Sequence, residues 1–203
     1  MRWNKFGNKF KTLSKRLGQF FVVSAPSGAG KTTLVNNLLR DFPDLVRSVS
    51  WTTRPQRPGE TDDLDYHFTD EASFRERVRK NYFFEWEEVH GSFYGTPLPP
   101  LLECRQKGGD VILDIDTRGA LNLKKAFPES CLIFLKPPSL EVLEKRLRDR
   151  HTEPEEAIRR RIENARRELK EKDKFDYVMV NDKLDRAYEE LKKIVLQVRQ
   201  KGE

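Results

Sequence analysis

Cysteine and histidine are scarce in this chain of 203 residues, and long apolar runs are missing. Its two cysteines, Cys104 and Cys131, lie far apart without CxxC spacing, which argues against structural zinc and fits a reducing compartment. The three histidines are equally scattered. No apolar run approaches the roughly 20 residues that a membrane-spanning helix needs. With 35% charged residues, the composition predicts a soluble, cytoplasmic protein without a histidine–cysteine metal site.

The net charge of +6 is concentrated at the amino terminus. Residues 1–18 contain no acid and carry six basic side chains: Arg2, Lys5, Lys9, Lys11, Lys15 and Arg16. The other 33 basic residues are balanced by 33 acidic ones. Because the remainder is neutral, the charge gives no reason to expect a nucleic-acid partner.

The same segment has a helical pattern of apolar residues. Spacings of three and four place five side chains on one helix face: Trp3, Phe6, Phe10, Leu13 and Leu17. We therefore expect residues 1–18 to form a basic amphipathic leader that rests on a membrane surface or docks to a partner. Its composition also resembles an organelle transit peptide, and a loosely ordered leader is the plainer alternative.

From Gln19 onward, apolar β-branched runs alternate with helical segments, which predicts an α/β fold with a parallel sheet. The buried strands expected are FFVVS (20–24), VILDI (111–115), CLIFL (131–135) and YVMV (177–180). The helices that follow them are expected at about 31–40, 118–126, 140–149 and 184–200.

More polar strand candidates lie between the first helix and VILDI, and they predict a small mixed sheet inserted into the fold. They are VRSVSW (46–51), YHF (66–68), FFEWEEV (83–89) and SFYG (92–95). Residues 139–172 are helical and rich in arginine. Ser139 is the expected N-cap of their first part, and Thr152 with Glu155 a capping box for the second.

The stretch SAPSGAGKTT (24–33) follows a buried strand and opens a helix, which is the context of a Walker A loop. Alanine replaces the usual first glycine. Gly28 and Gly30 allow backbone N–H groups to face phosphate oxygens, Lys31 would reach the β- and γ-phosphates, and the Thr32 hydroxyl would bind Mg²⁺. The pattern predicts a nucleoside triphosphate site that comprises Ala25, Pro26, Ser27, Gly28, Ala29, Gly30, Lys31, Thr32 and Thr33.

The stretch SWTTRPQRPGE (50–60) is too polar for a core strand and too rich in proline for a helix. Its guanidinium groups, Arg54 and Arg57, suit bidentate binding of a phosphate dianion. Ser50 and Tyr66 would add hydroxyl donors. Taken alone, the stretch is more typical of a solvated basic turn.

Five stretches together, SAPSGAGKTT, SVSWTTRPQRPGE, DYHF, FFEWEEVHGSFYGT and VILDIDTRGA, resemble guanylate kinase in their order and spacing. The resemblance runs from about residue 19 to 198. It implies a P-loop nucleoside monophosphate kinase that transfers the γ-phosphoryl group of ATP to GMP with Mg²⁺, giving ADP and GDP. A parallel sheet core, an inserted GMP-binding subdomain and a helical lid are implied with it.

The resemblance also implies roles for residues of the inserted subdomain. Glu85 would read the guanine base, whose ring N–H and amino group are neighbouring donors that one carboxylate can accept. Adenine lacks both donors and would leave a buried carboxylate unpaired. Thr96 would bond the guanine carbonyl and Asp116 would assist at the base edge. The GMP phosphate would be held by Ser50, Arg54, Arg57, Tyr66 and Tyr94.

By the same resemblance, arginines of the lid act on the transferring phosphoryl group. The implied catalytic set is Lys31, Arg54, Arg146, Arg150 and Arg161. Asp114 would lie near Mg²⁺ and act on it indirectly, beside the ligand Thr32. The implied organisation has the leader at 1–18 and a kinase domain at 19–203, with its core at 19–46, 104–138 and 173–203, the GMP-binding insert at about 47–103 and the lid at about 139–172.

Two other functions remain open at the level of sequence. One is a guanylate-kinase-like scaffold module that binds phosphorylated peptides through the arginine pair. It is disfavoured because Lys31, Thr32 and the lid arginines are present. The other is a kinase for a different nucleoside monophosphate, disfavoured by Glu85 and the tyrosines. ATP and GMP are the expected partners, and a monomer or a homodimer is the expected assembly.

Overall fold

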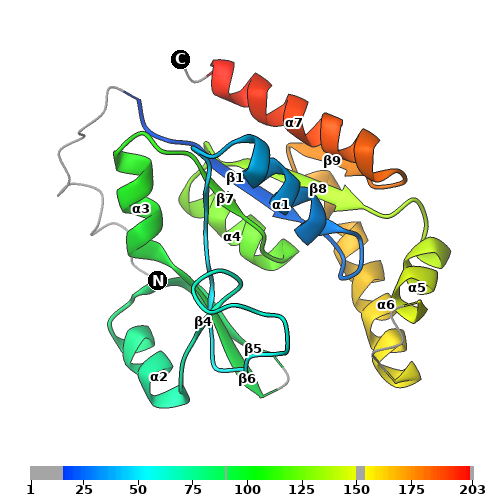
Figure 1. Ribbon diagram of the computed structural model, residues 1–203, viewed down its shortest axis with the longest axis horizontal. Helices are drawn as coiled ribbons and strands as arrows, with labels where there is room; N and C mark the ends of the chain where they lie inside the picture. The colour runs from blue at the N-terminus through cyan, green and yellow to red at the C-terminus, as the bar shows by residue number, and fades with distance from the viewer. Residues whose placement is uncertain (1–15, 90, 150–153, 202–203) are drawn as a thin grey trace. The chain divides into compact units, whose positions relative to one another are not determined.

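The computed structural model describes residues 16–89, 91–149 and 154–201 (Figure 1). The described residues divide into two compact units. The first unit comprises residues 16–18 and 46–113, and the second unit comprises residues 19–45 and 114–201. Most of the predicted leader lies outside the described residues, and residues 16–18 are not helical. In the described residues, no helix has the length and apolar character to cross a membrane.

In the second unit, three strands pair in parallel in the order β1-β8-β9. Helix α4 packs on β1 and β8, and α1 packs on β1 and on α7, which lies beside it in Figure 1. The elements are β1 (Phe20–Ser24), α1 (Lys31–Asp41), α4 (Thr117–Ala126), β8 (Cys131–Lys136), α5 (Leu140–Arg148), α6 (Glu155–Lys170), the 3₁₀ turn η1 (Lys172–Lys174), β9 (Tyr177–Val180) and α7 (Leu184–Lys201).

The core of the second unit follows from its sequence pattern. All five residues of β1 are buried, as expected for a parallel strand covered on both faces. Helix α7 buries residues at helical spacing, which forms one apolar stripe: Ala187, Leu191, Ile194 and Val195. The predicted N-cap Ser139 is confirmed, because its hydroxyl accepts a 3.2 Å hydrogen bond from Val142 N. The predicted capping box is wrong, because Pro154 is the N-cap of α6; Thr152 itself lies outside the described residues.

In the first unit, a four-stranded mixed sheet has the order β4-β3-β6-β5. Strands β3 and β4 are parallel, whereas β3–β6 and β5–β6 are antiparallel. Separately, β2 pairs with β7 in parallel. The elements are β2 (Val46–Arg47), β3 (Trp51–Thr52), β4 (His67–Phe68), α2 (Glu71–Arg79), β5 (Phe83–Val89), β6 (Ser92–Pro97), α3 (Leu98–Gln106) and β7 (Val111–Leu113).

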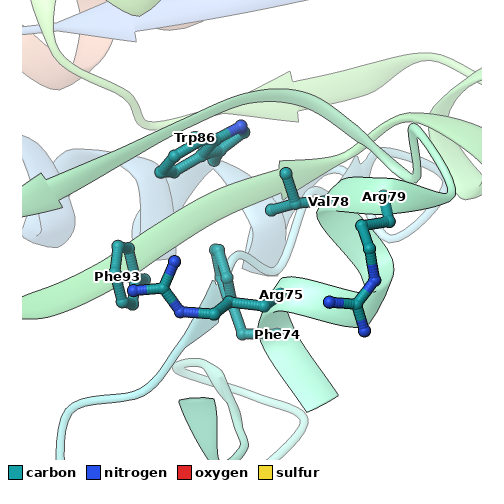
Figure 2. A pocket seen from close by; sticks show the side chains of 6 residues that line it. All are labelled: Phe74, Arg75, Val78, Arg79, Trp86 and Phe93. Carbon is teal, nitrogen blue, oxygen red and sulfur yellow. The ribbon is translucent and has the colours of Figure 1, made fainter. Parts of the chain in front are cut away.

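Aromatic rings join helix α2 to the mixed sheet. The ring of Phe74 stacks on Phe83 at 4.5 Å and on Phe93 at 5.6 Å between centroids. Trp51 packs beside this cluster, with the Arg77 guanidinium 3.9 Å from its ring centroid. Helix α2 and the mixed sheet also enclose an open apolar hollow of about 180 Å³. Figure 2 shows the side chains that line it, which are Phe74, Arg75, Val78, Arg79, Trp86 and Phe93.

The predicted α/β class with parallel strands is confirmed, with two corrections. The stretch 46–51 is not one strand of the mixed sheet: Val46–Arg47 pairs with β7, and only Trp51–Thr52 joins β6 and β4. The predicted strand 111–115 ends at Leu113. The next two carbonyls, of Asp114 and Ile115, accept hydrogen bonds from the Lys31 side chain.

Candidate active site

The loop between β1 and α1 has the strand–loop–helix arrangement that the sequence predicts. Gly28 and Gly30 have φ angles of 91° and 94°, which glycine adopts without the strain that other residues meet. A Cβ on Gly30 would also lie 2.3 Å from Asn181 Nδ2, so no larger residue fits there. Gly30 is the N-cap of α1, and the first-turn N–H groups of the helix are suited to phosphate oxygens.

Lys31 is held beside the segment that follows β7. Its Nζ donates hydrogen bonds to the carbonyl oxygens of Asp114, at 3.0 Å, and Ile115, at 3.3 Å. The carboxyl of Glu168 on α6 is half-buried, and the charges of Lys31 and Asp116 act on it. Burial and, to a smaller extent, the Asp116 carboxylate raise the pKa of Glu168 to about 7, while Lys31 opposes the shift.

The predicted magnesium residues offer oxygen donors in the second unit. Thr32 is exposed on the first turn of α1, and Asp114 is half-buried. In the described residues, no three histidine, cysteine or acidic side chains gather as a metal cage. A hydroxyl and a carboxylate are oxygen ligands that fit Mg²⁺, which keeps several waters and takes most of its other ligands from substrate phosphates. Asp116 is the N-cap of α4, because its Oδ1 accepts a 2.7 Å hydrogen bond from Gly119 N.

Two of the predicted lid arginines contact residues at or next to the phosphate loop. Arg161 Nη1 on α6 donates to the Ser27 hydroxyl at 2.8 Å. Arg146 Nη2 on α5 donates at 2.9 Å to the carbonyl of Asn181, whose side chain bonds the loop. Within the second unit, Arg161 thus contacts the loop directly, and Arg146 contacts Asn181, which is bonded to the loop. Arg150 lies outside the described residues.

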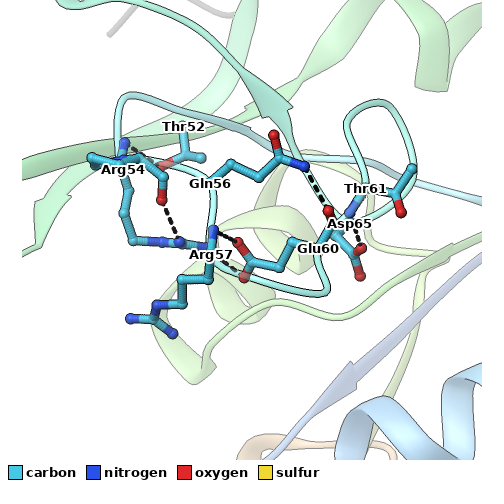
Figure 3. Close-up of polar contacts among 8 residues, drawn as sticks. Thr52, Arg54, Gln56, Arg57, Glu60, Thr61 and Asp65 are labelled. Atoms are coloured by element: carbon cyan, nitrogen blue, oxygen red, sulfur yellow. Dashed lines mark hydrogen bonds and ion pairs between the residues drawn. The ribbon is translucent and has the colours of Figure 1, made fainter.

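In the first unit, Arg54 is fixed from several sides (Figure 3). Its Nη2 donates to Glu60 Oε1 at 2.7 Å and its Nη1 to the carbonyl of Pro55 at 2.7 Å. The guanidinium carbon lies 5.4 Å from the ring centroid of Tyr66 and 5.7 Å from that of Phe68. Such contacts hold the planar group in one orientation.

Glu60 joins the two arginines of the predicted phosphate grip. Its Oε2 accepts from the backbone N of Arg57 at 2.8 Å, while Oε1 accepts from Arg54. The hydrogen bond from Arg54 holds the pKa of the Glu60 carboxyl below its usual value, and it raises the pKa of the Arg54 guanidinium. The Arg57 side chain is exposed. The carboxylate thus sets the spacing between the Arg54 fork and the Arg57 backbone.

The predicted base-reading residues are cross-strand neighbours. Glu85 on β5 pairs with Thr96 on β6 in the antiparallel register, so their side chains lie on the same face of the mixed sheet. Thr96 is 3% exposed and Glu85 is half-buried. Tyr94, two residues earlier on β6, lies 6.0 Å from Tyr66 between ring centroids.

The predicted acceptor residues therefore gather in the first unit, with one exception. They are Ser50, Arg54, Arg57, Tyr66, Glu85, Tyr94 and Thr96. Asp116 belongs to the second unit, with the phosphate loop and the lid arginines. One unit thus carries a carboxylate–arginine–tyrosine set, and the other carries the glycine loop between β1 and α1.

Comparison with known proteins decides the family. The family profile described as "Guanylate kinase" matches residues 18–198. The chain belongs to the guanylate kinase family. It is 52% identical over 182 residues to a guanylate kinase of Syntrophotalea carbinolica, across 90% of this chain and 87% of that protein. A guanylate kinase of Oleidesulfovibrio alaskensis is 48% identical over 177 residues, which are 87% of this chain and 86% of that protein.

A solved structure agrees with this assignment. The crystal structure of guanylate kinase from Anaplasma phagocytophilum matches with a TM-score of 0.75 at 32% identity. The match covers 93% of this chain and 88% of that chain. The resemblance to guanylate kinases that the sequence predicts is thereby confirmed.

Two residues of this guanylate kinase family member were missed from the sequence. Glu60 joins the Arg54 side chain to the Arg57 backbone. The feature of the sequence that could have indicated it is an acid three positions after Arg57 in an otherwise basic stretch. Asn181 bonds the phosphate loop, and its signal was its place directly after a parallel strand, at the sheet edge where ligands bind in α/β folds. A polar residue in that position is a candidate site residue even without a motif.

Proposed function

We infer that this chain is an ATP:GMP phosphotransferase that makes ADP and GDP. The observation that carries this inference is the cross-strand pair of Glu85 and Thr96. A carboxylate beside a hydroxyl on one face of a sheet offers acceptors for the two donors of guanine and a donor for its carbonyl oxygen. Adenine, cytosine and uracil do not present this pattern, so the pair supports GMP as the acceptor.

For the acceptor phosphate, we propose a grip made of Arg54, Arg57, Ser50, Tyr66 and Tyr94. The fixed orientation of Arg54 supports this role, because a preoriented guanidinium binds a phosphate without first losing rotamer freedom. Tyr66 and Tyr94 supply hydroxyl donors beside it. Together these groups would neutralise the dianion and aim one oxygen at the donor.

For the donor, we propose that the loop 25–30 and the first turn of α1 hold the ATP phosphates, with Lys31 on the β- and γ-phosphates. Thr32, with Asp114 acting indirectly, would hold Mg²⁺. When bound, Mg²⁺ neutralises charge on the phosphate oxygens. Arg146, Arg150 and Arg161 would stabilise the transferring phosphoryl group, which the contact of Arg161 with Ser27 supports.

The reaction needs placement and charge neutralisation rather than a base. The attacking atom is already a phosphate oxygen anion, so no proton has to be removed before it attacks. In-line approach and exclusion of water are then the main tasks of the protein. The division into core, GMP-binding insert and lid suits these tasks and remains a prediction, as do a cytoplasmic location and a monomer or homodimer.

The test is a coupled assay of ADP release with GMP, AMP, CMP and UMP as acceptors. We expect GMP to be used with a kcat/KM at least a hundredfold above the others. In Glu85→Gln, this preference should fall by at least tenfold, because the amide presents N–H to a guanine donor. Glu88→Gln, an exposed change on the same strand, serves as the control. Equal use of AMP and GMP by the unaltered protein would overturn the proposal.

A further inference from the structure

Asn181 is a buried polar residue that no nucleotide-site motif predicts. It follows β9 directly and is 5% exposed. Its Nδ2 donates to the carbonyl of Ala29 at 2.7 Å, and its backbone N donates to the carbonyl of Lys136 at 2.9 Å. Its own carbonyl accepts from Arg146 Nη2 at 2.9 Å. One residue therefore joins the phosphate loop, the end of β8 and an arginine of α5.

The bond to Ala29 acts between two glycines of the loop. Ala29 lies between Gly28 and Gly30, both with positive φ, so its peptide planes have little intrinsic preference. In a trans peptide the carbonyl and the following N–H point in opposite directions. Because Asn181 fixes the Ala29 carbonyl, it also fixes the direction of the Gly30 N–H on the opposite side of that peptide.

The site around this bond is closed to solvent. Ala29 is 0% exposed and the bond itself is buried, so water does not replace Asn181 as the donor. A buried carbonyl that loses its hydrogen-bond donor is left unpaired, and the free-energy cost of its desolvation is no longer offset. The loop would then turn the carbonyl elsewhere and carry the Gly30 N–H with it.

We propose that Asn181 is a positioning residue for phosphoryl transfer. Its side chain orients the phosphate loop, and its backbone carbonyl positions the Arg146 guanidinium against the same segment. Both effects act through one residue, so the position of the loop is coupled to the position of the Arg146 guanidinium. The inference rests on the proposed role of loop 25–30 as the donor phosphate site.

The test compares Asn181→Asp with Asn181→Ala in the full chain. Aspartate keeps the shape and the backbone carbonyl, but its carboxylate faces the Ala29 carbonyl and repels it. Alanine removes the donor without adding charge, so it keeps the test open if the aspartate variant fails to fold. We expect the dissociation constant for ADP with Mg²⁺ to rise at least tenfold in both, with a further loss in kcat and unchanged GMP affinity.

Asp176→Asn is the matched control, because Asp176 precedes β9 at its opposite end. Its carboxylate bonds Lys124 Nζ and Leu132 N. We expect this variant to lower Tm and to leave the ADP dissociation constant unchanged. If Asn181→Asp and Asn181→Ala bind ADP as the unaltered protein does, or if Asp176→Asn weakens ADP equally, the proposal is wrong.

A cycle with Arg146→Ala tests the link between Asn181 and Arg146. Because Arg146 bonds the Asn181 backbone, which the Asn181 side chain ties to the loop, the loss of kcat in the double variant should be smaller than the product of the single losses. Strictly multiplicative losses would contradict the link between Asn181 and Arg146. A chain that binds ADP but does not phosphorylate GMP would overturn the proposed function while leaving the ADP measurement on Asn181 valid.

Discussion

The Arg54 guanidinium and the Glu60 carboxylate form a 2.7 Å ion pair whose side chains are only 12% and 20% exposed. The second oxygen of the same carboxylate accepts from the backbone N of Arg57. Figure 3 shows the hydrogen bonds that join the Glu60 carboxylate to the Arg54 side chain and to the Arg57 backbone. The proposed phosphate grip is thus organised by an acid within the first unit, and its geometry does not depend on the arginines alone.

Glu60→Gln should therefore weaken GMP binding. The amide oxygen can accept from one of the two partners, and its NH₂ faces a donor in place of the other. We expect the KM for GMP to rise about tenfold, with the KM for ATP unchanged. Glu71→Gln, which removes an exposed pair with Arg75 on α2, is the control and should leave both constants unchanged. A lower KM for GMP in Glu60→Gln would mean that Glu60 competes with the phosphate.

Gly30→Ala should abolish ATP binding at the loop. The substitution meets both a left-handed backbone and the Asn181 amide, 2.3 Å from the new Cβ. Gly59→Ala is a matched control, since Gly59 has φ +87° and a Cβ added there would have no atom within 4 Å. Gly59→Ala should cost about 1 kcal/mol from backbone strain alone and keep its ADP affinity. Titration calorimetry with ADP distinguishes the two, and equal ADP affinities would contradict the steric argument.

Glu168 predicts a pH dependence of stability. Its folded-state pKa of about 7 lies above its ordinary 4.5, so the folded protein holds a proton there that the unfolded chain has lost. Stability should fall as the pH rises from about 4.5 to 7 and stay at the lower level above that window. Glu168→Gln should remove this fall and stabilise the protein at pH 8 by on the order of 2 kcal/mol.

Urea unfolding at pH 5 and pH 8 measures this effect directly. The control is Glu163→Gln, an exposed acid on the same helix that pairs with Arg167. We expect the difference between Glu168→Gln and the unaltered protein to be larger at pH 8 than at pH 5. An equal difference at both pH values would show that Glu168 is ionised in the folded protein throughout this range.

β1 and β8 were predictable because parallel strands covered on both faces read as continuous apolar runs; β1 has the predicted bounds and β8 extends one residue further. β9 also has the predicted bounds, but the expectation that it is buried is wrong, because only Met179 is buried and Val178 is exposed.

Helix α3 was not predictable in the same way, since Pro99 and Pro100 suggest a helix that starts a turn later, whereas α3 begins at Leu98. Both prolines are accommodated because the first turn of a helix leaves its N–H groups unpaired. Leu98 and Leu101 are buried in this turn.

The candidate site was partly predictable. Arg54 and Glu85 could be assigned because the stretches that contain them resemble guanylate kinase in order and spacing. The partners that orient the site could not, because Glu60 and Asn181 act through folded geometry: one carboxylate bridges a side chain and a backbone N, and one amide meets a carbonyl 152 positions away. Such contacts leave little periodic or motif-like trace in the sequence.

The central claim is that the donor and acceptor sites are two sets of residues, one in each unit. Equilibrium binding of ADP and of GMP to Lys31→Ala and Arg54→Ala, together with kcat, tests it most directly. We expect Lys31→Ala to lose transfer by at least a thousandfold and ADP affinity by at least tenfold while it binds GMP normally. Arg54→Ala should lose GMP affinity and keep that for ADP. Loss of both affinities in either variant would contradict the account.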